Sequence, residues 1–339
     1  MSCRSFKLLA LSGLLLPISA FGWGSKGHRI VVEVALQVNP KLVPRLKGVI
    51  SHLPESSQLK ELIKLAQATP LKELIKRKLA SPLNNKGALI ALIEKSQSKI
   101  YWEDLPRAAT WPDDIRDFPQ YTHKELRYNK HHFVNLVYGA GGKQDHLIKG
   151  DNAVARIEFY QKTIKHPGSS LGDKAWAAAW LLHLVGDLHQ PLHTTARNLK
   201  GGSKAENLDT GGNDVLYGPG EFDKLHGFWD GIPSGVPKNV DQYAADLRMQ
   251  FELDTDLNKR GRELRPQVWT YEGLTNIQNI GYPSDEPWTL GAVGKTGPVQ
   301  NIRVRIPAYD EEARKVVDRQ LYLAGVRLAR ILDKCLPKN

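Results

Sequence analysis

The segment AWLLHLVGDLHQPLHTT, residues Ala179–Thr195, places one aspartate and three histidines inside a run of otherwise apolar residues. The apolar positions are typical of the buried face of a helix. Burying a carboxylate among apolar side chains is costly unless the carboxylate is paired or binds a metal ion. The chain must therefore fold so that Asp187 meets buried partners, and those partners have to come from other parts of the sequence.

Two His/Asp pairs occur at helical spacing. His183 and Asp187 are four residues apart, so they share one helix face, and His226 and Asp230 repeat this spacing in KLHGFWDG. Pro191 is expected to end the first helix, with His193 just beyond it. A pocket of His and Asp without Cys suits zinc bound through nitrogen and oxygen. One such pair would be typical of a helix surface, whereas two pairs, together with a histidine near the N-terminus (His28) and the QPLH sequence, favour a metal centre.

Three short motifs elsewhere supply further candidate ligands. They are His28 in WGSKGH, Asp113 in ATWPDDIR and His132 in NKHHFVN. Two other histidines are expected to be structural. His189 would point about 200° away from the Asp187 face of the helix, and His131 is the neighbour of His132.

The hydrophobic periodicity of the chain is mainly helical. Helices are expected from Gly27, over 151–166 and 173–190, and from about Asp310 to Leu336, while no long alternating β-pattern occurs. Segments rich in Gly, Pro, Asn and Asp predict loops over roughly 196–222 and 278–308. The fold class is therefore predicted to be all-α, a single mainly helical domain with long loops.

The N-terminus is typical of a secretory signal peptide. Two basic residues precede an apolar run from Leu8 to Ile18 that is too short to span a membrane, and the small residues Ala20 and Gly22 follow it. Residues 1–22 are therefore predicted to be removed, which leaves a mature chain that begins at Trp23. This mature protein is expected to have no transmembrane segment and to be exported, either to the periplasm or fully secreted.

A basic segment precedes the ATWPDDIR motif and is interpreted as an insertion over about 51–100. It repeats LKELIK at Leu59 and Leu71, and residues 58–99 carry nine Lys/Arg and three Glu. That is a net charge of +6, out of +9 for the mature chain (45 Lys/Arg minus 36 Asp/Glu). The segment could be a pair of short solvated helices, or a basic surface that gathers an anionic substrate or touches a membrane.

Taken together, the motifs resemble a known family. WGSKGH, ATWPDDIR, HHFVN, LLHLVGDLHQPLH, GGND and LHGFWD occur in the order found in the trinuclear-zinc, single-strand-specific nucleases (the S-one/P-one nucleases of fungi, plants and bacteria). The motifs span 23–230, and the C-terminal third is more loosely similar. The resemblance implies a mainly helical domain of the zinc phospholipase C/S-one/P-one nuclease type, with three zinc ions at the bottom of a cleft.

The resemblance also implies a ligand set. One zinc ion would be held by Asp113, His132, His183 and Asp187, a second by His193, His226 and Asp230, and the third by His28, Asp187 and the amine and carbonyl of Trp23. Asp187 would thus bridge two ions. Two metal ions that share a water lower its pKa enough to give a nucleophile near neutral pH.

Four further residues match family positions that contact the substrate or its surroundings. Arg116 would contact the phosphate, Phe133 would stack on an unpaired base, and Asn213 in GGND would support the phosphate or the ligands. Asn135 stands where the best-known fungal member has an aspartate that binds the base. Because asparagine can donate as well as accept, the base preference stays open.

The resemblance implies a monomeric, zinc-dependent endonuclease with 3′-nucleotidase activity. It would cleave single-stranded DNA and RNA and 3′-nucleotides, and would release 5′-nucleotides. A zinc phospholipase C that acts on phospholipid head groups is the alternative. The last ligand of that enzyme is a glutamate in H-x3-E, whereas this chain has Asp230.

Overall fold

The computed structural model describes residues 23–68, 103–115, 128–138, 143–197, 208–220, 223–280, 300–302 and 305–338. The predicted signal peptide lies outside these residues, as does most of the basic segment. The first LKELIK repeat falls within helix α3 (Ser57–Ala68), as expected for a short helix, and the second repeat lies outside the described residues.

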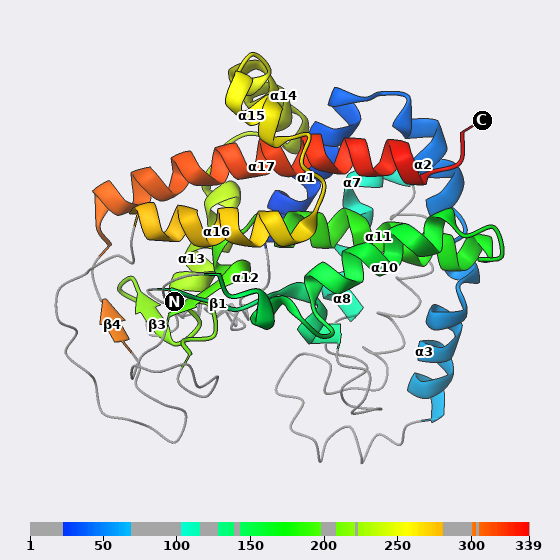
Figure 1. Cartoon of the computed structure of the whole chain (residues 1–339), viewed down its shortest axis with the longest axis horizontal. Coiled ribbons are helices and arrows are strands. Elements are labelled where there is room, and N and C mark those ends of the chain that lie inside the picture. The colour runs from blue at the N-terminus through cyan, green and yellow to red at the C-terminus, as the bar shows by residue number, and fades with distance from the viewer. Residues whose placement is uncertain are drawn as a thin grey trace, which may run out of the picture.

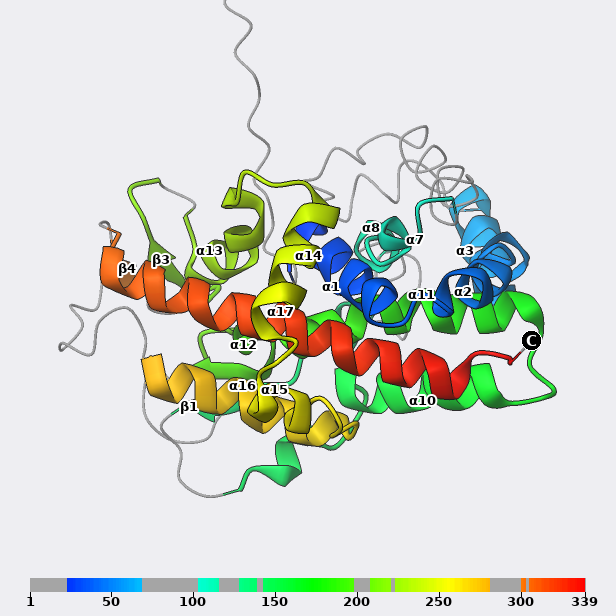
Figure 2. The same ribbon diagram turned by 90° about the horizontal axis from the view of Figure 1, so that it is seen from above.

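Helix α17 (Pro307–Cys335) is the longest element and extends across the molecule (Figure 1). Helix α1 (Ser25–Val38) packs against it, and Figure 2 shows α1 beside α17 from above. A Cβ atom added at Gly325 would lie 2.4 Å from Val34 Cγ1, so a glycine is required where the two helices approach each other. This close approach fixes the position of the helix that carries His28.

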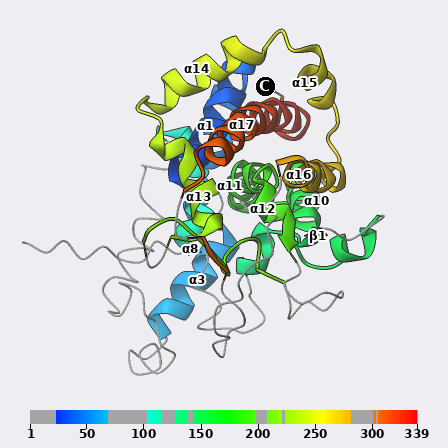
Figure 3. The ribbon, with the colours of Figure 1, turned by 90° about the vertical axis from the view of Figure 1, so that its left-hand side faces the viewer.

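Helix α11 (Leu171–Asp187) runs beneath α17, and α10 (Ala153–Lys165) packs beside it. The α11 N-terminus is capped by Ser170, whose side chain accepts a hydrogen bond from the Asp173 backbone N–H. Almost every residue of α11 is buried. Figure 3 views the bundle end on, with α11 below α17, α1 and α14 (Val240–Phe251) on one side, and α16 (Pro266–Ile280) and α10 on the other.

The remaining described helical elements are shorter. They are α2 (Leu42–Ile50), η1 (Leu53–Glu55), α7 (Leu105–Ala108), α8 (Trp111–Ile115), η2 (Tyr128–His132), η3 (Asp145–Ile148), α12 (Pro191–Thr194), α13 (Leu225–Gly231), η5 (Ile232–Gly235) and α15 (Thr255–Arg260). Several of these short elements carry the candidate ligands.

Two small parallel sheets lie at the lower edge of the bundle. Strand β1 (Leu136–Tyr138) pairs with β2 (Thr195–Arg197), and β3 (Val215–Tyr217) pairs with β4 (Gln300–Ile302). The first pairing joins the chain after η2 to the chain after α12. As a result, the sheet brings two segments that are far apart in the sequence to the same place.

The prediction of a single, mainly helical domain is confirmed, because the described strands are only three residues long. Three local predictions were wrong. Pro191 does not end the helix: α11 stops at Asp187, and Pro191 begins the next helical turn, where its missing N–H costs nothing. Strand β3 lies within the loop predicted over 196–222, and strand β4 lies within the loop predicted over 278–308. Among the described residues, no helix is long and apolar enough to cross a membrane.

Candidate metal centre

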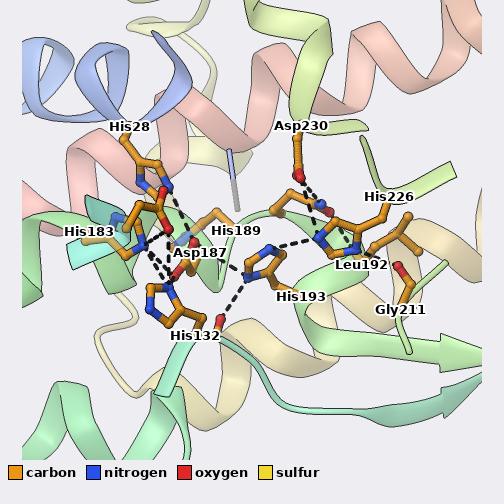
Figure 4. Close-up of polar contacts among 12 residues, drawn as sticks. His28, His132, His183, Asp187, His189, Leu192, His193, Gly211, His226 and Asp230 are labelled. Atoms are coloured by element: carbon orange, nitrogen blue, oxygen red, sulfur yellow. Dashed lines mark hydrogen bonds and ion pairs between the residues drawn. The ribbon is translucent and has the colours of Figure 1, made fainter. Parts of the chain in front are cut away.

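Eight of the predicted ligand side chains lie close together, and Figure 4 shows seven of them, all but Asp113, below α1 and α17. They come from six elements: His28 from α1, Asp113 from α8, His132 from η2, His183 and Asp187 from α11, His193 from α12, and His226 and Asp230 from α13. All are buried except Asp113, which is partly exposed. Charged and polar groups gathered at this depth need strong compensation.

Asp187 stands at the centre of this arrangement. Its Oδ2 atom lies 3.0 Å from both His132 Nδ1 and His183 Nε2. Its Oδ1 atom lies 3.4 Å from His28 Nε2 and 3.5 Å from His193 Nδ1. The two oxygens of this one carboxylate therefore face different histidines, which is the arrangement that a bridging ligand requires.

His193, His226 and Asp230 form a separate group of candidate ligands. His226 Nε2 is 3.2 Å from His193 Nε2 and 3.5 Å from Asp230 Oδ2. The pair predicted from helical spacing, His226 and Asp230, is thus joined by a histidine from a different helix.

Backbone carbonyls set the orientation of three of the imidazoles. His183 Nδ1 donates to the carbonyl of Ala109 at 2.7 Å, and His226 Nδ1 donates to that of Gly211 at 2.6 Å. His193 Nδ1 is 2.8 Å from the carbonyl of His132. In each ring the proton on Nδ1 leaves Nε2 directed at the group, a pattern common among histidines that bind metals.

The electrostatics of the residues around Asp187 favour a bound cation. Burial alone would lower the pKa of His183, but Asp187 and Asp113 outweigh it and raise this pKa to about 9. Burial lowers the pKa of His28 well below its usual value, and the neighbouring imidazoles of His183 and His193 lower it further. The carboxylates thus hold positive charge on one imidazole while another is kept neutral and able to donate a lone pair.

The donor set fits metal ions. Three groups bring one ligand atom from each residue to within 4.8 Å of the others: His28/Asp113/His183, His132/His183/Asp187 and His193/His226/Asp230. Neither ring nitrogen of His28 has a hydrogen-bond partner, although the side chain is fully buried. Nitrogen and oxygen donors of this kind suit zinc.

These groups agree largely with the ligand set implied by the resemblance. The His193/His226/Asp230 group corresponds to the predicted second zinc site. The His132/His183/Asp187 group contains three of the four residues predicted for the first zinc site. His28 is grouped with Asp113 and His183, and its Nε2 also lies 3.4 Å from Asp187 Oδ1, the residue predicted to share the third site with it.

Trp23 is fully buried beside these residues. A Cβ atom at Gly186 would lie 2.9 Å from His28 Nδ1 and 3.5 Å from Trp23 Cδ1. The backbone N–H of Gly24 donates to the Asp230 carbonyl at 3.1 Å. The predicted first residue of the mature chain therefore packs between the Asp187 helix and the Asp230 helix.

The predicted substrate-contacting residues are only partly described. Phe133 and Asn135 are half-buried and alternate with the buried Val134, directly after His132. The side-chain amide of Asn213 donates to the Thr210 carbonyl at 2.9 Å, within the turn that also supports His226. Arg116 lies outside the described residues, which stop at Ile115 in this part of the chain.

The two histidines predicted to be structural are both held by protein groups. His189 Nδ1 donates to the Val185 carbonyl at 2.7 Å, and Arg327 Nη1 donates to His189 Nε2 at 2.8 Å. His131 Nε2 lies 3.2 Å from Asp151 Oδ2. Although each is next to or near a candidate ligand in sequence, neither belongs to one of the described ligand groups.

One polar residue at the centre was not predicted. Gln190 is fully buried, and its side-chain Nε2 donates to Asp230 Oδ1 at 2.8 Å. The only sequence signal was its place in HQPLH, where a glutamine at the predicted end of a helix looks like an ordinary polar position.

Comparisons with known proteins find a family match and two related nucleases. The sequence profile of the family described as S1/P1 nuclease matches residues 23–337. The chain is 23% identical over 257 residues to Endonuclease 1 of Arabidopsis thaliana, covering 68% of this chain and 75% of that protein. It is 29% identical over 134 residues to Nuclease S1 of Aspergillus oryzae, covering 37% of this chain and 40% of that protein.

Proposed function

Because this chain belongs to the S1/P1 nuclease family, we propose that it is a zinc-dependent phosphodiesterase that cleaves single-stranded DNA and RNA. We further propose 3′-nucleotidase activity, with 5′-nucleotides as products. The observation that carries the proposal is the position of Asp187, whose two oxygens face two different sets of imidazoles. A single shared carboxylate is what places two metal ions close enough to act on one phosphate.

Three zinc ions would be held by the residues of the three ligand groups together with Trp23. When bound, zinc supplies an activated water and stabilises charge that develops on the phosphate oxygens. The chain itself orients the ligands: the carbonyls of Ala109, Gly211 and His132 each fix one imidazole. The apolar residues of α11 exclude bulk water from the inner side of the centre, which strengthens its electrostatic interactions.

Recognition of single strands is assigned to the segment after His132. Phe133 is half-buried and adjacent to a candidate ligand, so a base stacked on its ring would bring the neighbouring phosphate towards the metal groups. Stacking requires a base that is free of its complementary strand. Asn135, two residues further along, is proposed to hydrogen-bond that base, and Arg116 is proposed to contact the phosphate.

An assay on four substrates separates this function from the phospholipase alternative. The purified mature protein is incubated with single-stranded DNA, RNA, a 3′-nucleotide and phosphatidylcholine, before and after exhaustive chelation. We expect turnover of the first three substrates, lost on chelation and recovered with added zinc. Hydrolysis of phosphatidylcholine alone, or full activity after chelation, would contradict the proposal.

Phe133→Ala tests the origin of single-strand preference. The variant should lower kcat/KM on single-stranded DNA by about 5- to 150-fold, which corresponds to the roughly 1–3 kcal/mol that stacking on one base contributes. Its zinc content should equal that of the unaltered protein. Unchanged kinetics on every nucleic-acid substrate would remove Phe133 from the substrate site.

Export and activity are proposed to be linked through Trp23. A free α-amine has a pKa of about 7.7–8.0, low enough for a zinc ion to displace its proton, whereas the amide nitrogen of an uncleaved chain has no available lone pair. The family match starts at residue 23, which supports a mature chain beginning there. The unprocessed precursor should then be nearly inactive, keeping nuclease activity out of the cytoplasm.

Two versions of the mature protein test this link, one beginning at Trp23 and one carrying a single additional Gly before it. The extended version should bind less zinc and turn over single-stranded DNA far more slowly. Equal zinc content and equal activity in the two versions would show that the α-amine is not a ligand.

A further inference from the structure

Gln190 occupies a special position between two of the helices that carry candidate ligands. It directly precedes α12, which carries His193, and it contacts Asp230 of α13. His193 and Asp230 belong to the same ligand group. The Gln190 side chain is fully buried, so both ends of its amide must be satisfied by protein.

The orientation of the Gln190 amide follows from its partners. The backbone N–H of Leu192 can only donate, and it lies 2.6 Å from Gln190 Oε1. The amide nitrogen must therefore face Asp230 Oδ1, 2.8 Å away, and donate to it. The carbonyl end of this side chain caps the helix that holds His193, while its N–H end holds the carboxylate of Asp230.

This contact determines which Asp230 oxygen faces the metal group. Oδ1 is engaged by Gln190, and Oδ2 is turned towards His226, whose Nε2 is 3.5 Å away. Figure 4 shows Asp230 above the imidazoles of His193 and His226. The backbone of Gln190 adds to the connection, since its N–H donates to the Asp187 carbonyl at 2.9 Å and its carbonyl accepts from His193 N–H at 2.9 Å.

We propose that Gln190 is a positioning residue for the His193/His226/Asp230 metal site: its amide sets the spacing of α12 and α13 and presents Asp230 Oδ2 to the metal ion. The proposal rests on the metal binding included in the proposed function. Removing a partner that orients a metal ligand typically weakens metal affinity by about 10- to 100-fold. The effect should be confined to one of the three zinc ions, because the other two groups do not include Asp230 or His193.

Gln190→Glu is the most direct test. Glutamate keeps the shape and can still accept from Leu192 N–H, but it replaces the donor that faces Asp230 with a second carboxylate. Two adjacent carboxylates repel unless one of them takes up a proton, which removes the orienting hydrogen bond. Gln190→Met is the uncharged companion, since it has a similar length and lacks both polar atoms.

Gln144→Glu is the matched control. Gln144 is also a buried glutamine with both amide ends engaged, accepting from Val137 N–H at 2.6 Å and donating to the Val137 carbonyl at 3.0 Å. Its isosteric replacement disturbs a buried amide to a similar degree without touching a ligand group. A purely structural role for Gln190 predicts that both substitutions have the same effect.

Zinc retained per chain is measured against increasing concentrations of a chromophoric chelator, and thermal unfolding of the metal-free forms is followed in parallel. Both Gln190 variants should release one zinc ion at chelator concentrations about 10- to 100-fold lower than the unaltered protein. The remaining ions should be unaffected, and excess zinc should restore turnover of single-stranded DNA. Gln144→Glu should keep the zinc profile of the unaltered protein.

Each other outcome overturns the inference. An unchanged zinc profile in both Gln190 variants would show that Asp230 needs no orientation. Loss of all three ions, equal loss in Gln144→Glu, or failure of both Gln190 variants to fold would make Gln190 a general structural residue. If the unaltered protein itself binds no zinc, the proposed function fails together with this inference, which distinguishes the two results.

Discussion

The two sides of the turn that follows α11 bury polar groups in different ways. On the metal side, defined by Asp187, His132 and His183, two imidazole nitrogens face each other at 2.9 Å beside a carboxylate. On the arginine side, defined by His189, Arg327 and Glu272, cation and carboxylate meet in a two-pronged contact at 2.7 and 2.8 Å. One cluster is closed by protein groups, and the other is arranged for an added cation.

This difference shows that residue type does not identify a ligand histidine. Asp187 and His189 are two positions apart and both are buried, yet Arg327 N–H occupies the lone pair of His189 Nε2. His131 and its neighbour His132 both face a carboxylate, but Asp187, next to His132, belongs to a candidate ligand group, whereas His131 faces the exposed Asp151. The groups that surround an imidazole, and not its place in the sequence, therefore distinguish a candidate ligand.

The largest expected effect comes from removing Asp187. Asp187→Ala leaves the two sets of imidazoles without the carboxylate between them, so we expect loss of at least one zinc ion. A fall in kcat/KM of roughly 10²–10³-fold or more should accompany it, the scale associated with losing a central charge-stabilising group. Stability should fall as well, because bound metal stabilises the folded state. Elemental analysis checks the first point, and a normal zinc content would exclude the bridging role.

Arg327→Met should destabilise the arginine side without affecting metal binding. Glu272 would stay mostly buried and lose its closest cation, and breaking a buried ion pair costs about 3–5 kcal/mol. Arg260, 3.4 Å from Glu272, remains and favours the lower end of this range. Chemical denaturation measures the loss, and a variant that lost zinc would show that the two sides are coupled.

The pH dependence of the stability lost in Arg327→Met follows from the pKa of Glu272. Burial alone would raise its pKa, but the Arg327 contacts outweigh burial and lower it. The stabilisation from ionised Glu272 is therefore complete above the pKa of a glutamate in the unfolded chain, about 4.3. It is lost as the pH falls through the lowered pKa of Glu272 in the folded protein. The difference in stability between the unaltered protein and Arg327→Met should accordingly be largest near neutral pH and shrink in acid, since a protonated Glu272 needs no cation. A difference that does not change with pH would contradict this account.

The smallest expected effect separates the adjacent histidines. His131→Gln removes one contact to the exposed Asp151 and should cost about 1 kcal/mol with zinc content unchanged. His132→Gln, the same change one residue away, should lower zinc content and activity. Metal analysis of the two purified variants makes the comparison, and equal zinc contents would mean that orientation does not distinguish these residues.

The amino-acid sequence was sufficient for the features that depend on near neighbours along the chain. Helical spacing alone placed His183 beside Asp187 and His226 beside Asp230, because residues four apart on a helix share a face whatever surrounds them. The hydrophobic periodicity of the chain likewise predicted a mainly helical domain. The order of the motifs indicated the nuclease family, which the profile match over 23–337 confirmed.

Contacts between distant segments required the folded structure. Gln190 meets Asp230 across forty positions of sequence, and Arg327 reaches His189 across 138. No periodic pattern encodes such pairings, because they depend on how helices pack and on the path of the chain between them. The position at which α11 ends also required the folded structure. Because α11 ends at Asp187, Gln190 lies outside this helix and its amide can turn towards Asp230. Packing therefore decided which polar groups hold the candidate ligands in place, whereas local spacing had indicated only the His183/Asp187 and His226/Asp230 pairs.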